Sequence, residues 1–157
     1  MTQEKAERPP TTEPVAGVTL LYLLKQVELA VRSNLEDVTG AHGLTSLQYT
    51  ALTVLERRQG LTSAALARNS FVRPQTMAQM ITVLEDRRLI RRDKDPVNRR
   101  QYLLSLTELG QQALDFLRVD VEALEARMVS GLDEPEIAAM RLALRSCRLA
   151  LGGRDPH

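Results

Sequence analysis

Uncharged hydrogen-bonding side chains recur at helical spacing in the middle of this 157-residue chain, at Gln75, Thr76, Gln79 and Thr82. Apolar side chains take the other face, at Met77, Met80, Ile81 and Leu84. A glutamine both donates and accepts, which suits the edge of an adenine in the major groove of DNA, and the preceding Arg73 suits a phosphate or a guanine edge. Such a face is often merely solvated, but its position opposite an apolar stripe, within the order of elements described below, favours a helix that reads bases.

A basic segment surrounds and follows this helix. Residues 44–106 contain eleven basic and five acidic side chains, a net charge of +6, whereas the rest of the chain carries −5. The cations that suit backbone phosphates are Arg87, Arg88, Arg91, Arg92 and Lys94. Arg99 and Arg100 are long enough to enter a narrow minor groove. Charge runs are often only solvated surface, but a basic middle between acidic ends is typical of a nucleic-acid-binding surface.

Residues that could support catalysis or metal binding are scarce. Two histidines, His42 and His157, and the single Cys147 supply too few ligands for a metal site, and no glycine-rich phosphate loop or nucleophile motif is present. We therefore expect no enzyme, no metal and no cofactor. Cys147 lies on the apolar stripe of the last predicted helix, so we expect a buried thiol and not a redox sensor.

The composition carries no sign of export or membrane insertion. Residues 1–14 hold charges and three prolines without an apolar run, and the apolar stretch at 18–24 is far shorter than a bilayer span. A single cysteine cannot form an intrachain disulfide, so nothing in the chain requires an oxidising compartment. These features predict a cytoplasmic protein without a membrane partner.

Hydrophobic periodicity predicts the elements that position these side chains. An apolar helix extends over residues 18–40, and a second follows Thr45, whose spacing to Gln48 fits a capping box. We expect that second helix to bury Leu47, Ala51, Val54 and Leu55. Thr62 can cap a short third helix, and Pro74 suits the first turn of a fourth.

After the fourth helix the hydrophobic period changes to two. Residues 89–92 and 101–106 predict a β-hairpin around the turn-forming segment 95–100. Thr107 then caps a long helix, and Asp133 with Glu136 caps a last one. The expected fold class is therefore mainly α with a small β-hairpin (α+β), and an aromatic content of 3% also favours a helical core.

The order of these elements is that of a winged helix-turn-helix, and the chain resembles the MarR (multiple antibiotic resistance regulator) family of bacterial transcription factors. The segments that carry the resemblance are 43–49, 72–77, 84–92, 95–100 and 104–110. We expect a flexible tail at 1–14, and the resemblance implies a single winged-helix domain at 15–157. Within that domain, dimerisation helices at 15–40 and 107–153 carry a DNA-binding lobe at 44–106, whose wing is 89–106. In one departure, Asn98 replaces an aspartate that commonly helps to hold the wing arginine, here Arg100.

The resemblance also implies a function: a homodimer that binds a pseudo-palindromic operator in double-stranded DNA and represses transcription. Many members release DNA when a small phenolic or aromatic acid enters a cleft between the dimerisation helices and the lobe. Arg32, His42 and Tyr49 are candidate contacts, because a cation with imidazole and phenol donors suits an aromatic carboxylate, although a lone histidine is more often structural. The alternative is a winged-helix module that binds protein or RNA, because a fold alone does not determine its ligand.

Overall fold

Six helices and one hairpin make up the computed structural model, which describes residues 17–152. The helices are α1 (Leu20–Gly40), α2 (Ser46–Arg57), α3 (Ser63–Asn69), α4 (Pro74–Asp86), α5 (Glu108–Met128) and α6 (Glu134–Ala150), and the strands are β1 (Ile90–Lys94) and β2 (Tyr102–Leu106). The predicted fold class is confirmed. The predicted tail at 1–14 and His157 lie outside the described residues.

Polar caps begin the helices where the sequence predicts them. The Thr45 hydroxyl accepts the backbone N–H of Gln48, and the Gln48 side chain accepts the backbone N–H of Thr45. Asp133 and Glu136 form the same reciprocal pair at α6. Thr107 caps α5 through the backbone N–H of Gly110. Each cap satisfies N–H groups that have no partner within the helix, so the starting residue of each helix is set locally.

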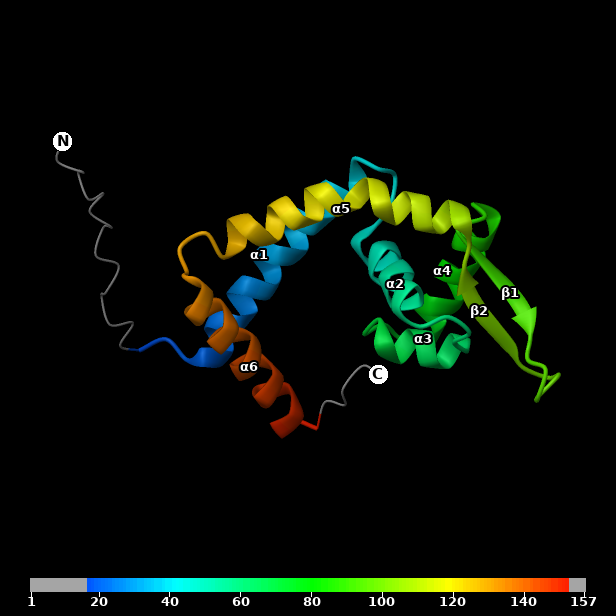
Figure 1. The fold of residues 1–157 in the computed structure, drawn as a ribbon. Coiled ribbons are helices and arrows are strands. Elements are labelled where there is room, and N and C mark those ends of the chain that lie inside the picture. Colours follow the sequence, from blue (N-terminus) through cyan, green and yellow to red (C-terminus); the bar gives the residue numbers. More distant parts are fainter. Residues whose placement is uncertain (1–16, 153–157) are drawn as a thin grey trace.

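The helices α2, α3 and α4 and the hairpin enclose one apolar core, and we call this part of the molecule the lobe (Figure 1). Its fully buried side chains include Leu52, Leu55, Leu66, Met77 and Leu84. The predicted face of α2 is partly wrong, because Leu47 is 42% exposed and Leu52 is buried in its place. Since α2 packs against α1, α3, α5 and β2, its neighbours and not its own periodicity determine which arc is buried.

The hairpin is buried at its root and exposed at its tip. Its strands are antiparallel and pair Ile90 with Leu106 and Lys94 with Tyr102. At the root, Leu61 and Leu104 exchange two backbone hydrogen bonds, with N–O distances of 3.1 and 2.7 Å. A third segment therefore holds the base of the hairpin, while the tip extends away from the core (Figure 1).

The long helix α5 connects the lobe to a second region, which consists of α1 with residues 41–43 that follow it, the C-terminal half of α5 and α6; we call it the frame (Figure 1). No residue of α6 is buried in the single chain, and Cys147 is exposed. The prediction of a buried Cys147 is therefore wrong for the single chain, because α6 buries none of its residues against the described elements. Among the described residues, no helix has the length and apolar character needed to cross a bilayer.

Both turns that flank α4 adopt an unfavourable backbone conformation. Phe71 has φ +58° and Arg88 has φ +57°, in the left-handed region that glycine usually occupies. This conformation costs a side-chain-bearing residue roughly 1–2 kcal/mol. At both positions local backbone hydrogen bonds close the end of the preceding helix, from Val72 N–H to the Ala67 carbonyl and from Leu89 N–H to the Leu84 carbonyl, which offsets part of this cost.

Candidate nucleic-acid interface

The helix α4 presents the predicted polar face to solvent. Its exposed side chains include Gln75, Thr76, Gln79 and Thr82, while the four apolar residues of the opposite face are buried. The Thr82 hydroxyl donates to the Ala78 carbonyl at 3.3 Å and offers its lone pairs outward. Arg73 is the N-cap residue, and its side chain makes no capping bond. Roughly two helical turns of α4 therefore carry donors and acceptors that no described residue covers.

The tip of the hairpin is a turn organised by two polar side chains. The Asp95 carboxylate accepts the backbone N–H groups of Val97 and Asn98 at 2.8 and 3.2 Å. The Asn98 side-chain oxygen accepts the backbone N–H of Arg100 at 3.2 Å, and its amide donates to Gln101 at 3.3 Å. Asn98 thus orders the backbone before Arg100 and does not hold its guanidinium. Arg99 and Arg100 are exposed.

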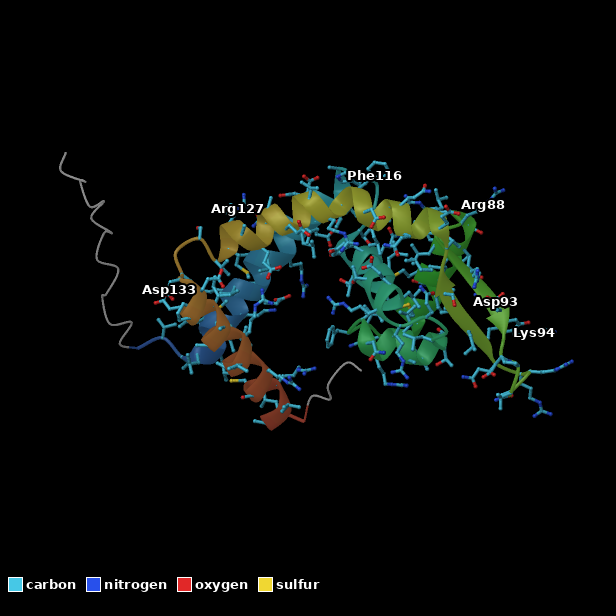
Figure 2. The ribbon with its side chains drawn as sticks, viewed as in Figure 1. Arg88, Asp93, Lys94, Phe116, Arg127 and Asp133 are labelled. Atoms are coloured by element: carbon cyan, nitrogen blue, oxygen red, sulfur yellow. The ribbon has the colours of Figure 1, made fainter. Side chains whose placement is uncertain are left out.

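Two of the predicted cations on β1 are engaged in ion pairs. Arg91 pairs with Asp93 at 3.0 Å on one face of the strand, and Lys94 extends beside Asp93 near the tip (Figure 2). On the other face, Arg92 pairs with Glu85 of α4 at 2.6 Å and lies 5.6 Å from the centre of the Tyr102 ring. Sequence reasoning missed this contact of Arg92, which ties the hairpin to the C-terminal end of α4.

A groove of about 600 Å³ separates α4 from the hairpin. The residues that line it include Thr62 and Ser63 before and at the start of α3, Thr82 of α4, and Arg92, Arg100 and Tyr102 of the hairpin. Hydroxyls, guanidinium groups and a phenol suit the oxygens of a sugar-phosphate strand. The sequence suggests Thr82, Arg92 and Arg100, but only the fold brings Thr62, Ser63 and Tyr102 beside them.

The remaining two predicted cations lie at the C-terminal end of α4. Arg87 is its C-cap residue, and the guanidinium donates to the Gly43 carbonyl with an Nη1–O distance of 2.7 Å. Arg88 lies beside the start of α5, where the Thr107 hydroxyl donates to its carbonyl at 2.6 Å (Figure 2). This end of α4 therefore faces the frame and the start of α5, while the candidate base contacts lie on the turns that precede it.

The three candidate effector contacts have different partners in the structure. The Arg32 guanidinium pairs with Glu28 on the exposed surface of α1. His42 contacts Asp120 of α5, with an Nε2–Oδ2 distance of 3.0 Å. Burial, together with the nearby Glu56 carboxylate, raises the pKa of the Tyr49 phenol above its ordinary value.

A cavity of about 310 Å³ follows the seam between α1 and α5. It is lined by Val38, Asp120, Ala123, Leu124 and Arg127, so His42 borders it through Asp120. The side chains of Arg32 and Tyr49 are not among its lining residues.

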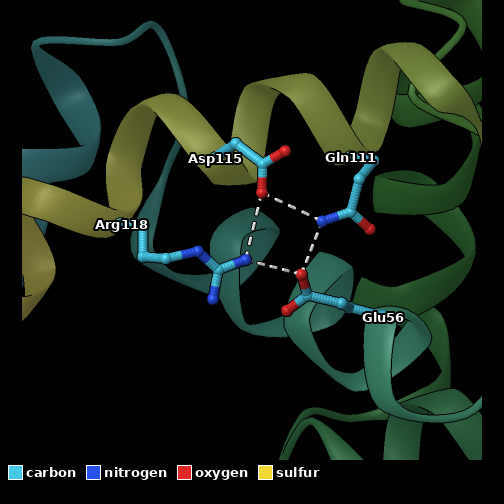
Figure 3. A network of polar contacts seen from close by, with 4 residues as sticks. All are labelled: Glu56, Gln111, Asp115 and Arg118. Carbon is cyan, nitrogen blue, oxygen red and sulfur yellow. Dashed lines mark hydrogen bonds and ion pairs between the residues drawn. The ribbon is translucent and has the colours of Figure 1, made fainter.

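A polar network that the sequence analysis did not anticipate connects α2 to α5 (Figure 3). Glu56 accepts from Gln111 at 2.6 Å and from Arg118 at 2.8 Å, and both donors also reach Asp115 at 3.1 Å. Hydrogen bonds from Arg118 and Gln111 lower the pKa of the Asp115 carboxyl. The spacing of Gln111, Asp115 and Arg118 along one face of α5 is the only sequence signal for this network, since Glu56 lies more than fifty residues away.

Comparisons with known proteins agree with this architecture. The pattern that defines the MarR family matches residues 42–101. The HTH-type transcriptional repressor Rv2887 of Mycobacterium tuberculosis is 30% identical over 115 residues, which cover 73% of this chain and 83% of the relative. The structure of Rv2887 in complex with p-aminosalicylic acid has a TM-score of 0.69 at 28% identity, over 83% of this chain and 98% of that one.

For a second relative, CouR, a structure of the DNA complex is known. The transcriptional repressor CouR bound to a 23-mer DNA duplex has a TM-score of 0.75 at 25% identity, over 82% of this chain and 92% of that one. CouR from Rhodococcus jostii RHA1 has also been solved with p-coumaroyl-CoA, with a TM-score of 0.72 at 26% identity, over 80% of this chain and 89% of that one.

The polar helix α4 and the basic hairpin beside it define a winged helix-turn-helix protein, in which α4 is the recognition helix and the hairpin is the wing. The chain belongs to the MarR family and is a DNA-binding regulator of transcription.

Proposed function

We propose that this protein is a ligand-responsive repressor that binds a pseudo-palindromic operator as a homodimer. The observation that carries the proposal is the exposed polar face of α4 next to the exposed wing arginines Arg99 and Arg100. Gln75, Thr76 and Gln79 read base edges, with Arg73 and Thr82 at the margins of the same face. Arg99 and Arg100 enter the minor groove from the turn that contains Asn98. The cations Arg88, Arg91, Arg92 and Lys94 supply affinity through phosphates.

A selection of bound duplexes from a random pool tests the operator proposal. We expect the purified protein to recover a palindromic sequence whose half-sites lie about one helical turn apart, because two recognition helices related by a two-fold axis face one side of the duplex. Enrichment without a common sequence would contradict operator-specific binding. It would favour the alternative of a winged-helix module that binds protein or RNA.

We predict that the chain is a dimer at micromolar concentration. Apolar side chains of both terminal helices are exposed in the single chain, among them Leu20 (77%), Leu21 (74%), Leu142 (67%) and Leu144 (46%). Leaving so much apolar surface in water favours association, and a two-fold interface covers it. Sedimentation equilibrium should give about twice the chain mass of 17.6 kDa. A well-behaved monomer would contradict the division into dimerisation helices at 15–40 and 107–153 and a lobe at 44–106.

We further infer that phenolic or aromatic acids release the protein from DNA. Both relatives described above have been solved with such a compound or its thioester, p-aminosalicylic acid and p-coumaroyl-CoA. An effector lowers DNA affinity only through its higher affinity for the DNA-incompetent dimer. Arg32, His42 and Tyr49 remain the proposed polar contacts, and of these His42 borders the cavity between α1 and α5.

The effector proposal predicts that His42→Ala raises the concentration of a salicylate-like acid needed to dissociate the operator complex, by about tenfold for the loss of one charge-assisted contact. Fluorescence anisotropy of a labelled operator duplex, titrated with a panel of phenolic acids, measures this concentration. Gln112→Ala, which changes an exposed side chain of α5, serves as the control. If no compound of the panel shifts the curve of the unaltered protein, the effector proposal is wrong, while DNA binding stands.

We infer that the protein acts by binding and not by catalysis, in agreement with relatives that are regulators of transcription. A protein that binds an operator works where the bacterial chromosome lies. We therefore propose a cytoplasmic location.

A further inference from the structure

The C-terminal end of the recognition helix makes a long-range contact with the frame. The guanidinium of Arg87 donates to the carbonyl of Gly43, 44 residues earlier, with an Nη1–O distance of 2.7 Å. Gly43 lies in the junction between α1 and α2, where its φ of +70° suits a glycine. This junction is itself tied to α1, since the Glu36 carboxylate accepts both the hydroxyl and the backbone N–H of Ser46. Arg87 therefore binds a carbonyl in a junction that is itself attached to α1.

A second set of contacts fixes the residues after Arg87 to the start of α5. The Thr107 hydroxyl donates to the Arg88 carbonyl at 2.6 Å, and the Thr107 backbone N–H donates to the Leu89 carbonyl at 3.1 Å. The left-handed conformation of Arg88 is what allows the chain to turn between these contacts. The end of α4 is thus attached to α5 through Thr107 and to the junction through Arg87.

These contacts close into a ring. His42, the neighbour of Gly43, contacts Asp120 of α5 at 3.0 Å, and α5 returns through Thr107 to the end of α4. A rearrangement of α1 against α5 that breaks the His42–Asp120 contact therefore allows Gly43 to move relative to Thr107, and with it the end of α4. Gln75 lies twelve residues before Arg87, which is about 18 Å along the helix axis. A small rotation of α4 about its C-terminal end therefore displaces Gln75 further than it displaces the residues near Arg87.

We propose that Arg87 is a positioning residue: its contact with Gly43 sets the orientation of the recognition helix against the frame, and it does not bind a DNA phosphate. The proposal rests on the proposed function, in which α4 reads the operator. Arg91 is the natural comparison, because it is an exposed arginine on the wing whose only described partner is Asp93 of its own strand.

Salt dependence separates the two roles. Each phosphate contact contributes about 0.9 to the slope of log K against log salt concentration, so a dimer that loses two contacts changes its slope by about 1.8. We expect Arg87→Ala to bind the selected operator duplex about tenfold more weakly, with the slope of the unaltered protein and unchanged affinity for random-sequence duplex. Arg91→Ala should weaken binding to both duplexes and lower the slope.

Anisotropy titrations of both duplexes across a potassium chloride series measure these quantities, and thermal melting confirms that each variant is folded. Arg87→Met, which retains the aliphatic stem, repeats the test in case the alanine variant is unstable. Unchanged operator affinity, or a slope lowered as in Arg91→Ala, would overturn the proposal. If the unaltered protein selects no operator, the proposed function fails instead, so the two failures are distinguishable.

Discussion

Gly110→Ala is expected to destabilise the folded protein by about 3 kcal/mol or more, because the new methyl group has no space and the atoms around it cannot yield cheaply. A Cβ at this position would lie 2.1 Å from the Leu89 carbonyl oxygen and 2.7 Å from the Leu106 Cδ1 atom. The first of these is backbone at the root of the wing, so α5 and β1 must separate to admit the methyl group. Urea unfolding at a fixed protein concentration measures the loss, since dimerisation makes stability depend on concentration.

Gly40 offers a matched control for this substitution. It is also helical, as the last residue of α1, and a Cβ there would meet nothing within 4 Å. Gly40→Ala should therefore be neutral or slightly stabilising, because alanine favours the helix by up to about 1 kcal/mol over glycine. Equal free energies of unfolding for the two variants would show that the close approach of α5 to the wing is not required.

Gln79→Ala is expected to weaken binding to the operator by about 1–3 kcal/mol for each half-site, while binding to random-sequence DNA stays nearly unchanged. The side chain is exposed on α4 two turns before the end of the helix, and its loss removes a base contact but no charge. Anisotropy titration with the selected operator and with a scrambled duplex measures both affinities. Asp86→Ala, at the exposed end of the same helix, tests whether any substitution on α4 has this effect.

A phosphate contact should behave differently from this base contact. Arg91→Ala should weaken binding to both duplexes to a similar degree, since phosphates carry no sequence information. An operator preference unchanged in Gln79→Ala would mean that a different face of α4, or a different element, reads the bases. Asp86→Ala losing as much specificity as Gln79→Ala would show that the effect arises from the helix as a whole.

Much of the site was predictable because it depends on residues close together in the chain. The polar and apolar faces of α4 follow from helical spacing, and the caps at Thr45, Thr107 and Asp133 use side chains that contact a backbone group three residues away. The turn at the wing tip also closes within a few residues, around Asp95 and Asn98. Such patterns are complete in the sequence, so their structure could be derived without knowledge of the rest of the fold.

The buried face of α2 and the exposure of Cys147 were not predictable in the same way. Leu52 and not Leu47 is buried because helices from three other parts of the chain pack around α2. Cys147 lies on an apolar stripe, as expected, but the single chain places no buried residue on α6. An apolar stripe indicates that something covers it; it does not indicate whether the cover is the same chain or a second copy.

The sequence by itself determined that this protein has a polar recognition helix, a basic wing and two apolar terminal helices, since helical and strand periodicity encode these faces directly. Some charged side chains have local partners, such as Arg91 with Asp93, but only the tertiary structure decided the partners of those that pair across elements. A count of positive charges treats Arg87, Arg92 and Arg100 alike. In the fold, Arg87 donates to Gly43, Arg92 pairs with Glu85, and Arg100 lines the groove. The physical reason is that long charged side chains select partners by distance in space, and separate elements meet only after the core has packed, whether seven residues apart, as Arg92 and Glu85 are, or 44, as Arg87 and Gly43 are.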